Sequence, residues 1–194
     1  MVARNPSTAP ARLQHIRCFC LGLALLTLGL SPLRAESREY QIKAAFLVNF
    51  MQFVTWPDSV FTNENAPFSI AVLGDDPFGP ALDQTLQGET VNHHKIVVQR
   101  VRRVEDCKDC QMIFVSRSEE KNLPAILAKV DSGPVLTVSE TRGFARQGGI
   151  INFYLEDKKV RFEINPVVAQ RANLKISAQL LSLGKIVEPA KGGS

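Results

Sequence analysis

The chain has 194 residues, with 23 Lys plus Arg, 19 Asp plus Glu and a formal net charge of +4 at pH 7. The excess comes from Arg4, Arg12, Arg17 and Arg34, so residues 36–194 carry 19 basic and 19 acidic residues. This balance gives no support for a protein that binds nucleic acid or a charged membrane surface.

Residues 1–35 have the pattern of a secretory signal peptide. Arginines precede an uncharged run at residues 18–30, and Pro32 and the small Ala35 follow it. Such a run spans about 20 Å as a helix, which is shorter than the roughly 30 Å hydrocarbon core of a bilayer. We therefore expect cleavage near Ala35 and export, rather than a retained anchor, and no direct membrane insertion of the mature chain.

Residues 36–187 suit one domain with a single core, and residues 188–194 are expected to form a disordered tail. The first element of this domain is a helix over residues 40–54. It should end before Trp56 and Pro57, since a residue that precedes proline avoids the helical region.

The polar side chains of this helix share one narrow face, and the rest of its surface is apolar. An ordinary surface helix has an apolar stripe little wider than 100°. The helix is therefore either central to the core or packs a second face on a partner protein or a second copy of the chain. In the latter case Phe46, Phe50 and Phe53 are the candidate contacts. The polar face consists of Gln41, Ala45, Asn49 and Gln52.

Strand and helix patterns then alternate. Apolar runs near residues 67–74, 94–101, 111–116 and 134–139 predict strands, with helices near 77–88 and 119–130 between them. Nearly continuous apolar strands that alternate with helices are typical of a parallel sheet covered by helices.

The C-terminal part has a different pattern. Alternating apolar and polar residues on both sides of residues 156–159 predict an antiparallel hairpin with one face in water. Asn165 and Pro166 should begin a helix, which Asn173 should end. A second helix should carry Ile176, Leu180, Leu183 and Val187 toward the core. The predicted fold is α/β: a mixed, mostly parallel sheet flanked by helices, with a C-terminal β-hairpin and closing helices.

Cys107 and Cys110 form a Cys-x-x-Cys pair in a polar turn before an apolar strand. A thioredoxin-type pair instead follows a strand and opens a helix, whose dipole stabilises the thiolate. Here Glu105, Asp106 and Asp109 disfavour a thiolate. The pair is therefore expected to be a structural disulfide or two unreactive thiols.

A zinc site would need further ligands, for which His93 and His94 are the candidates. Adjacent residues of a strand point to opposite faces, so both histidines cannot easily bind one ion. We expect no metal, no cofactor and no catalytic residue, because the common nucleophile and phosphate-binding motifs are also missing from the sequence.

Asp75 and Asp76 follow the first strand at its carboxyl end, where open α/β sheets bind ligands. The pair could bind a cation or another small ligand. It could equally cap the following helix, which is the commoner use of such residues.

Four segments of the chain resemble the YfiR family of periplasmic proteins: residues 40–57, 68–79, 110–116 with Cys110, and 134–187. The resemblance implies a periplasmic, non-enzymatic regulator that binds the periplasmic part of an inner-membrane diguanylate cyclase. It would hold the cyclase inactive and so lower cyclic-di-GMP and biofilm formation. Relatives tend to form dimers, and some carry a further cysteine pair where this chain has Ala145 and Asn152.

Under this interpretation Glu163, Asn165 and Arg171, on or just after the wet face of the hairpin, are expected to contribute to docking. Similar domains also occur in membrane histidine kinases. The alternative function is therefore a small-ligand sensor that uses Asp75 and Asp76.

Overall fold

The structure is a computed structural model that describes the backbone of residues 31–131 and 133–189, and side chains from residue 38 onward. The chain divides into two compact units, Met1–Arg38 and Glu39–Ser194, and the second contains the whole sheet. Residues 1–30 of the expected signal segment and residues 190–194 of the expected tail lie outside the described residues. No described helix combines the length and the apolar character that a membrane crossing requires.

Eight strands form one sheet in the order β10-β8-β7-β6-β5-β2-β4-β3. Its central strands are parallel neighbours, as predicted: β4, β2, β5 and β6. The connection from β2 to β4 runs through α3, and the connection from β5 to β6 runs through the 3₁₀ turn η3 and α4. The bounds of these elements are β2 Phe68–Leu73, α3 Pro80–Leu86, β4 His94–Val101, β5 Cys110–Val115, η3 Arg117–Asn122, α4 Leu123–Val130 and β6 Leu136–Ser139.

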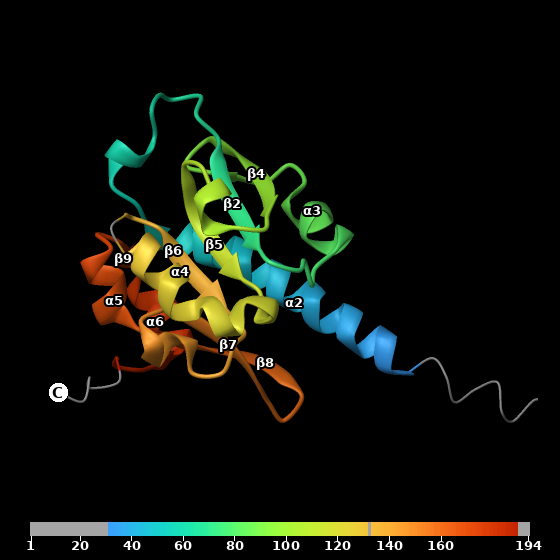
Figure 1. Cartoon of the computed structure of the whole chain (residues 1–194). Helices are drawn as coiled ribbons and strands as arrows, with labels where there is room; N and C mark the ends of the chain where they lie inside the picture. The colour runs from blue at the N-terminus through green and yellow to red at the C-terminus, as the bar shows by residue number, and fades with distance from the viewer. Residues whose placement is uncertain (1–30, 132, 190–194) are drawn as a thin grey trace, which may run out of the picture. The chain divides into compact units, whose positions relative to one another are not determined.

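The sheet separates two apolar cores. One lies between the sheet and the helices α2 (Ser31–Phe53) and α3, and the other lies between the sheet and α4. Figure 1 shows α4 in front of the strands and α2 behind them. Alternate residues of β2 supply the two cores, since Ile70 and Val72 face α2 whereas Ala71 and Leu73 face α4.

The predicted hairpin is formed by β7 (Ile151–Glu156) and β8 (Lys159–Ile164). Asp157 and Lys158 both have positive φ, as a tight two-residue hairpin turn requires. The strand β7 runs parallel to β6, and the short β10 (Lys185–Ile186) runs parallel to β8.

Two residues of the hairpin differ from the expected alternation. Leu155, expected inside, is 54% exposed, because it lies near the turn. Asn152, expected in water, is buried, and its Nδ2 donates hydrogen bonds to the carbonyls of Ser139 and Thr141. This amide joins β7 to the end of β6, so the expected solvent-exposed face of the hairpin is buried where it adjoins β6.

The closing segment follows the prediction only at first. The helix α5 (Pro166–Arg171) begins after Asn165, and Asn173 has a φ of 55°, as expected at a helix end. The predicted second helix is wrong in length. Residues 174–187 instead form β9 (Lys175–Ile176), α6 (Ala178–Leu183) and β10, because the Ser177 side chain caps a new helix and Gly184 ends it.

A second, two-stranded sheet pairs β9 with β1 (Val54–Thr55), directly after α2. The next residue, Trp56, donates its indole N–H to the carbonyl of Gln111 at 3.0 Å. The register between β2 and β5 shifts at this point, and Ser69 N donates to Gln111 Oε1 at 2.7 Å. The Gln111 carbonyl and its side-chain oxygen therefore both accept a hydrogen bond where Trp56 packs. The remaining short elements are η1 Asp58–Val60, β3 Thr90–Val91, η2 Val104–Asp106 and η4 Phe144–Gln147.

Candidate functional site

Glu163 lies on β8, between β7 and β10, and each of these strands places a residue next to it. Its register partners are Asn152 on β7 and Lys185 on β10. Glu163 Oε1 lies 3.5 Å from Lys185 Nζ and 4.0 Å from Arg146 Nη2. The Glu163 side chain is 14% exposed, whereas those of Lys185 and Arg146 are 59% and 50% exposed. An approaching protein therefore meets the two cations before the carboxylate.

Asn165, the second expected docking residue, is fully buried. Its Oδ1 accepts a hydrogen bond from Val168 N at 3.1 Å, and its Nδ2 donates to the carbonyl of Ala145 at 2.7 Å. The side chain thus caps α5 and joins it to η4. A side chain without exposed surface cannot contact a partner in this conformation, so its role in this structure is to position α5.

Arg171 is exposed at the end of α5. It lines a cleft of about 380 Å³ together with Arg146, which comes from η4. Arg146 therefore connects two of the expected docking residues: it forms an ion pair with Glu163 and shares a cleft with Arg171. No sequence pattern indicates these contacts, because Arg146 belongs to a short turn between Gly143 and Gly148.

Two of the three expected phenylalanine contacts, Phe46 and Phe50, belong to an aromatic cluster. Phe50 is fully buried and packs on Phe153 and Phe162, with ring centroids 5.5 and 5.0 Å apart. Phe46 and Phe53 are partly buried against the same core. The four polar-face residues of the helix are all exposed. The helix is therefore packed in the core and Phe50 has no exposed surface, whereas partner contacts at the partly buried Phe46 and Phe53 stay a prediction.

Exposed apolar side chains gather in the C-terminal segment. Six large hydrophobic side chains of the described residues are exposed, and Val167, Leu183 and Ile186 are three of them. Val167 lies one helical turn before Arg171, and Leu183 and Ile186 flank Lys185 in the sequence. Apolar side chains beside accessible cations are typical of a protein-binding surface. We call Arg146, Glu163, Val167, Arg171, Leu183, Lys185 and Ile186 the C-terminal surface.

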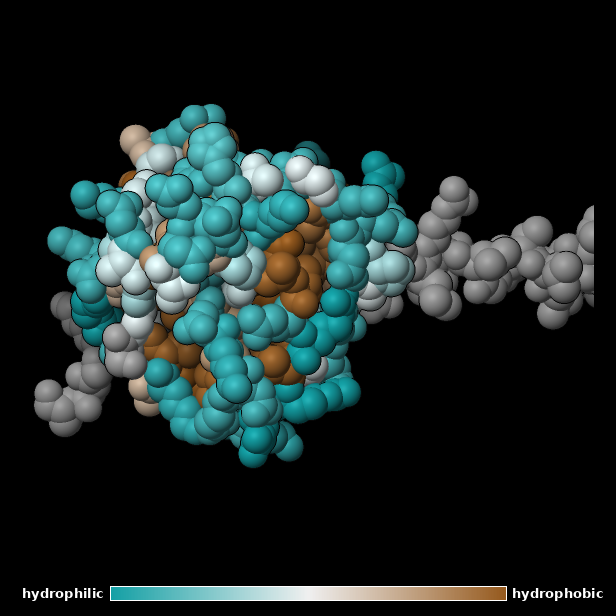
Figure 2. All heavy atoms as spheres, turned by 90° about the horizontal axis from the view of Figure 1, so that it is seen from above, coloured by the Kyte–Doolittle hydropathy of each residue, from teal (hydrophilic) through white to brown (hydrophobic). Residues whose placement is uncertain are grey.

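An apolar groove of about 520 Å³ lies between α3 and the outer edge of β4, where Leu86, Ile96 and Val98 line it. Figure 2 views the molecule from above the orientation of Figure 1, and it shows hydrophobic surface recessed between hydrophilic side chains. Among the described strands, β3 pairs with only two residues of β4. Lys95 and Arg100 flank the open edge, and such charges discourage edge-to-edge pairing.

Asp75 and Asp76 are both engaged with arginines. Asp76 Oδ1 accepts from the backbone N–H groups of Phe78 and Gly79 at 2.8 and 3.3 Å, and its Oδ2 accepts from Arg100 Nε at 2.7 Å. Asp75 forms an exposed ion pair with Arg102. Asp76 thus caps the turn that leads into α3, although the helix begins at Pro80 rather than near Pro77.

Arg100 also binds Asp83 on α3. The hydrogen bonds that Arg100 donates, first to Asp83 and then to Asp76, raise the pKa of its guanidinium further above its ordinary value. The Asp76 carboxylate is therefore already neutralised by a permanent cation, which makes it a poor ligand for a metal ion.

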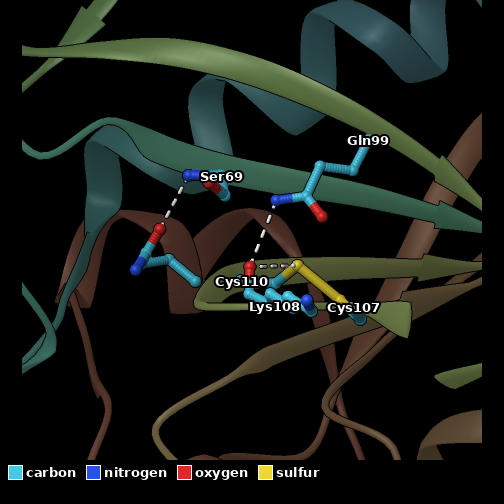
Figure 3. Close-up of a disulfide and its surroundings, with 6 residues drawn as sticks. Ser69, Gln99, Cys107, Lys108 and Cys110 are labelled. Carbon is cyan, nitrogen blue, oxygen red and sulfur yellow. Dashed lines mark hydrogen bonds between the residues drawn. A yellow bond between two sulfur atoms is a disulfide. The ribbon is translucent and has the colours of Figure 1, made fainter. Parts of the chain in front are cut away.

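Cys107 and Cys110 are paired, with Cα atoms 6.1 Å apart. Figure 3 shows the bridge at the start of β5, where Gln99 of β4 donates from its Nε2 to the carbonyl of Lys108 at 3.1 Å. The turn that contains the pair is thus fixed to the sheet twice, through β5, which Cys110 begins, and through Gln99 of β4. Its place before a strand, rather than before a helix, favours a local structural bridge.

The two histidines considered as zinc ligands have different environments in the structure. His94 is buried and stacks on Phe61, and its Nδ1 lies 2.6 Å from the carbonyl of Ala66. His93 is exposed. Within the part of the chain that the structure describes, no three His, Cys, Asp or Glu side chains are close enough to hold a metal ion.

Sequence reasoning missed a buried polar cluster that joins α2 to the end of β6. Lys43 forms ion pairs with Glu39 and with Glu140, and the Tyr40 hydroxyl donates to both Glu140 oxygens at 3.0 and 3.2 Å. A lysine among apolar positions of the helix was the available signal. Glu140 could not be assigned as its partner from the sequence, since 97 positions separate the two residues.

Comparison with known proteins agrees with the architecture. The chain aligns with a conserved domain protein from Vibrio cholerae O1 biovar El Tor, with a TM-score of 0.53 at 8% identity. The alignment covers 76% of this chain and 59% of the other, and this likeness concerns the fold alone. The family profile described as YfiR/HmsC-like (DUF4154) matches residues 40–185. The chain therefore belongs to the YfiR/HmsC-like family.

Proposed function

We propose that this chain is a non-enzymatic periplasmic regulator that binds the periplasmic part of an inner-membrane diguanylate cyclase and holds it inactive. It would thereby lower cyclic-di-GMP and biofilm formation. The observations that carry the proposal are the exposure of Val167, Leu183 and Ile186 and the accessible cation of Lys185, all in the C-terminal part of the chain. Family membership supplies the class of partner.

The surface has the two components that a protein interface needs. Burial of exposed apolar side chains contributes most of the affinity, and a few central residues usually dominate it. Cations at the rim increase the association rate and select the partner by charge. Leu183, at 63% exposure, has the largest exposed fraction of the exposed large hydrophobic side chains in the described chain, so its burial would remove the most apolar surface from water relative to its size.

The test compares two exposed leucines. We expect Leu183→Asp to weaken binding to the periplasmic domain of the cyclase about tenfold or more, as loss of a central contact does. Leu155→Asp is the matched control, because Leu155 is 54% exposed near the hairpin turn. Affinity is measured with the purified chain, and cyclic-di-GMP is measured in cells that express each variant.

Both variants change solvated side chains, so both should fold normally. If Leu183→Asp binds as well as the Leu155→Asp control and leaves cyclic-di-GMP unchanged, the C-terminal surface is not the docking site. If the chain binds no diguanylate cyclase and a small ligand raises its melting temperature, the alternative of a small-ligand sensor that acts with a membrane histidine kinase holds. For that alternative, Asp75 and Asp76 would first have to leave their arginine partners.

A further inference from the structure

The cleft between α4, η4 and α5 has a basic rim and an apolar wall. Arg146 and Arg171 stand at its rim, and α4 supplies Pro124, Leu127 and Ala128 to its wall. Its volume of about 380 Å³ is sufficient for one or two side chains of another protein.

The cations of this cleft are available. The Arg171 side chain makes no hydrogen bond or ion pair within the described chain, and the Arg146 side chain makes only the 4.0 Å ion pair with Glu163. Asp131, which follows α4, is the one acidic residue among those that line the cleft. Two guanidinium groups and one carboxylate leave the lining with a net positive charge.

We propose that this cleft receives an acidic segment of the partner protein, in which a carboxylate side chain binds between Arg146 and Arg171 and a neighbouring apolar side chain packs on α4. The inference rests on the proposed function and specifies the chemistry of its partner. A guanidinium group binds a carboxylate through two parallel N–H···O hydrogen bonds, which fixes orientation as well as charge.

Continuity with the rest of the C-terminal surface favours a protein over a free anion. Val167 and Arg171 lie one turn apart on α5, and Arg146 connects the cleft to Glu163 and Lys185. A free anion would use the arginines but would leave the exposed Pro124 and Val167 uncovered. A segment with both acidic and apolar side chains uses all of them.

The direct test titrates the full chain with a blocked hexapeptide of alternating Leu and Glu. The same peptide with Gln in place of Glu and inorganic phosphate serve as comparisons. Binding is followed by the NMR signals of the arginine Nε–H groups. We expect the Glu peptide to shift the Arg146 and Arg171 signals, and Arg171→Glu to weaken its binding about tenfold, as loss of a charge-assisted hydrogen bond does.

Arg103→Glu is the charge control, since Arg103 is exposed elsewhere and binds only Asp106. Equal weakening by Arg103→Glu, equal shifts with the Gln peptide, or equal binding of phosphate would each overturn the proposal. So would the absence of a shift at these two arginines.

Binding to the cyclase domain separates this inference from the proposed function. If Leu183→Asp abolishes that binding while Arg171→Glu leaves it intact, the docking surface stands and the acidic-segment inference fails. If both variants weaken binding and the Arg103→Glu control does not, both proposals are supported.

Discussion

Lys43 of α2 and Glu140, directly after β6, form an ion pair inside the protein, with only 3% and 5% of their side chains exposed. Glu140 also accepts hydrogen bonds from Tyr40, and Lys43 binds Glu39 one turn earlier on α2. The cluster fixes the middle of α2 to the carboxyl edge of the sheet. No other described ion pair has both side chains buried to this degree.

Removal of either partner should destabilise the protein strongly. We expect Lys43→Met to lower the free energy of unfolding by about 3–5 kcal/mol, because it leaves the buried Glu140 charge without its counterion. Glu140→Met should fall at the lower end of this range, because Lys43 keeps its ion pair with Glu39. The double variant should lose much less than the sum, since no unpaired charge remains between these two positions. Urea unfolding of the four proteins measures this. Strict additivity of the two losses would show that the ion pair is not coupled.

Tyr40 should make the protein less stable at high pH. Burial, followed by the charge of Glu140 and the hydrogen bond to it, raises the pKa of Tyr40 well above its ordinary value. An unfolded tyrosine releases its proton near pH 10, whereas the folded protein retains it. The stabilisation is therefore complete below about pH 10 and is lost as the pH rises further.

The measurement is the urea midpoint at pH 8 and at pH 11 for the natural chain and for Tyr40→Phe. The variant should lose stability at pH 8, where the hydrogen bond to Glu140 is present, and show a smaller decrease between the two pH values. Tyr154→Phe is the control for tyrosine ionisation elsewhere. Equal decreases for the natural chain and Tyr40→Phe would contradict the assignment.

The strands were predictable because a strand buried on both faces is a continuous apolar run in the sequence. The segments around Ile70, Ile113 and Val138 are continuous apolar runs, and they became neighbouring parallel strands buried on both faces. The wide apolar surface of α2 likewise favoured a helix that packs in the core, and α2 packs on the sheet with its narrow polar face in solvent. Each of these features depends on residues that are close in sequence.

The polar contacts were not predictable, because their partners are distant in sequence. Arg146 meets Glu163 through the packing of η4 on the end of β7, and Lys185 meets it only because β10 adds to β8. The apolar spacing from Ile176 to Val187 predicted one helix, although local capping by Ser177 divided it. The two ends of the expected helix pair as strands instead, β9 with β1 and β10 with β8, so strand pairing between distant segments overrode the helical pattern.

The disulfide is expected to contribute little to stability. A bridge that closes so short a loop stabilises by about 2 kcal/mol or less, and Gln99 holds the same turn without it. We expect Cys107→Ala/Cys110→Ala to shift the urea midpoint slightly and to leave affinity for the cyclase domain unchanged. Reduction of the natural chain should give the same result. A large loss of affinity on reduction alone would instead assign the pair a regulatory role.

Asn165 distinguishes a folding role from a docking role. We expect Asn165→Ala to lower the free energy of unfolding by about 2–3 kcal/mol, since it removes the cap of α5 and leaves the carbonyl of Ala145 without a donor. Asn165→Ser should recover part of this, because a serine oxygen can still accept from Val168 N. Thermal and urea unfolding give the stabilities, and affinity for the cyclase domain is measured at a temperature where both variants are folded. If Asn165 only positions α5, folded Asn165→Ser binds nearly as well as the natural chain, whereas Leu183→Asp does not. A folded, stable Asn165→Ser protein that fails to bind would show that this buried amide becomes exposed on docking and contacts the partner.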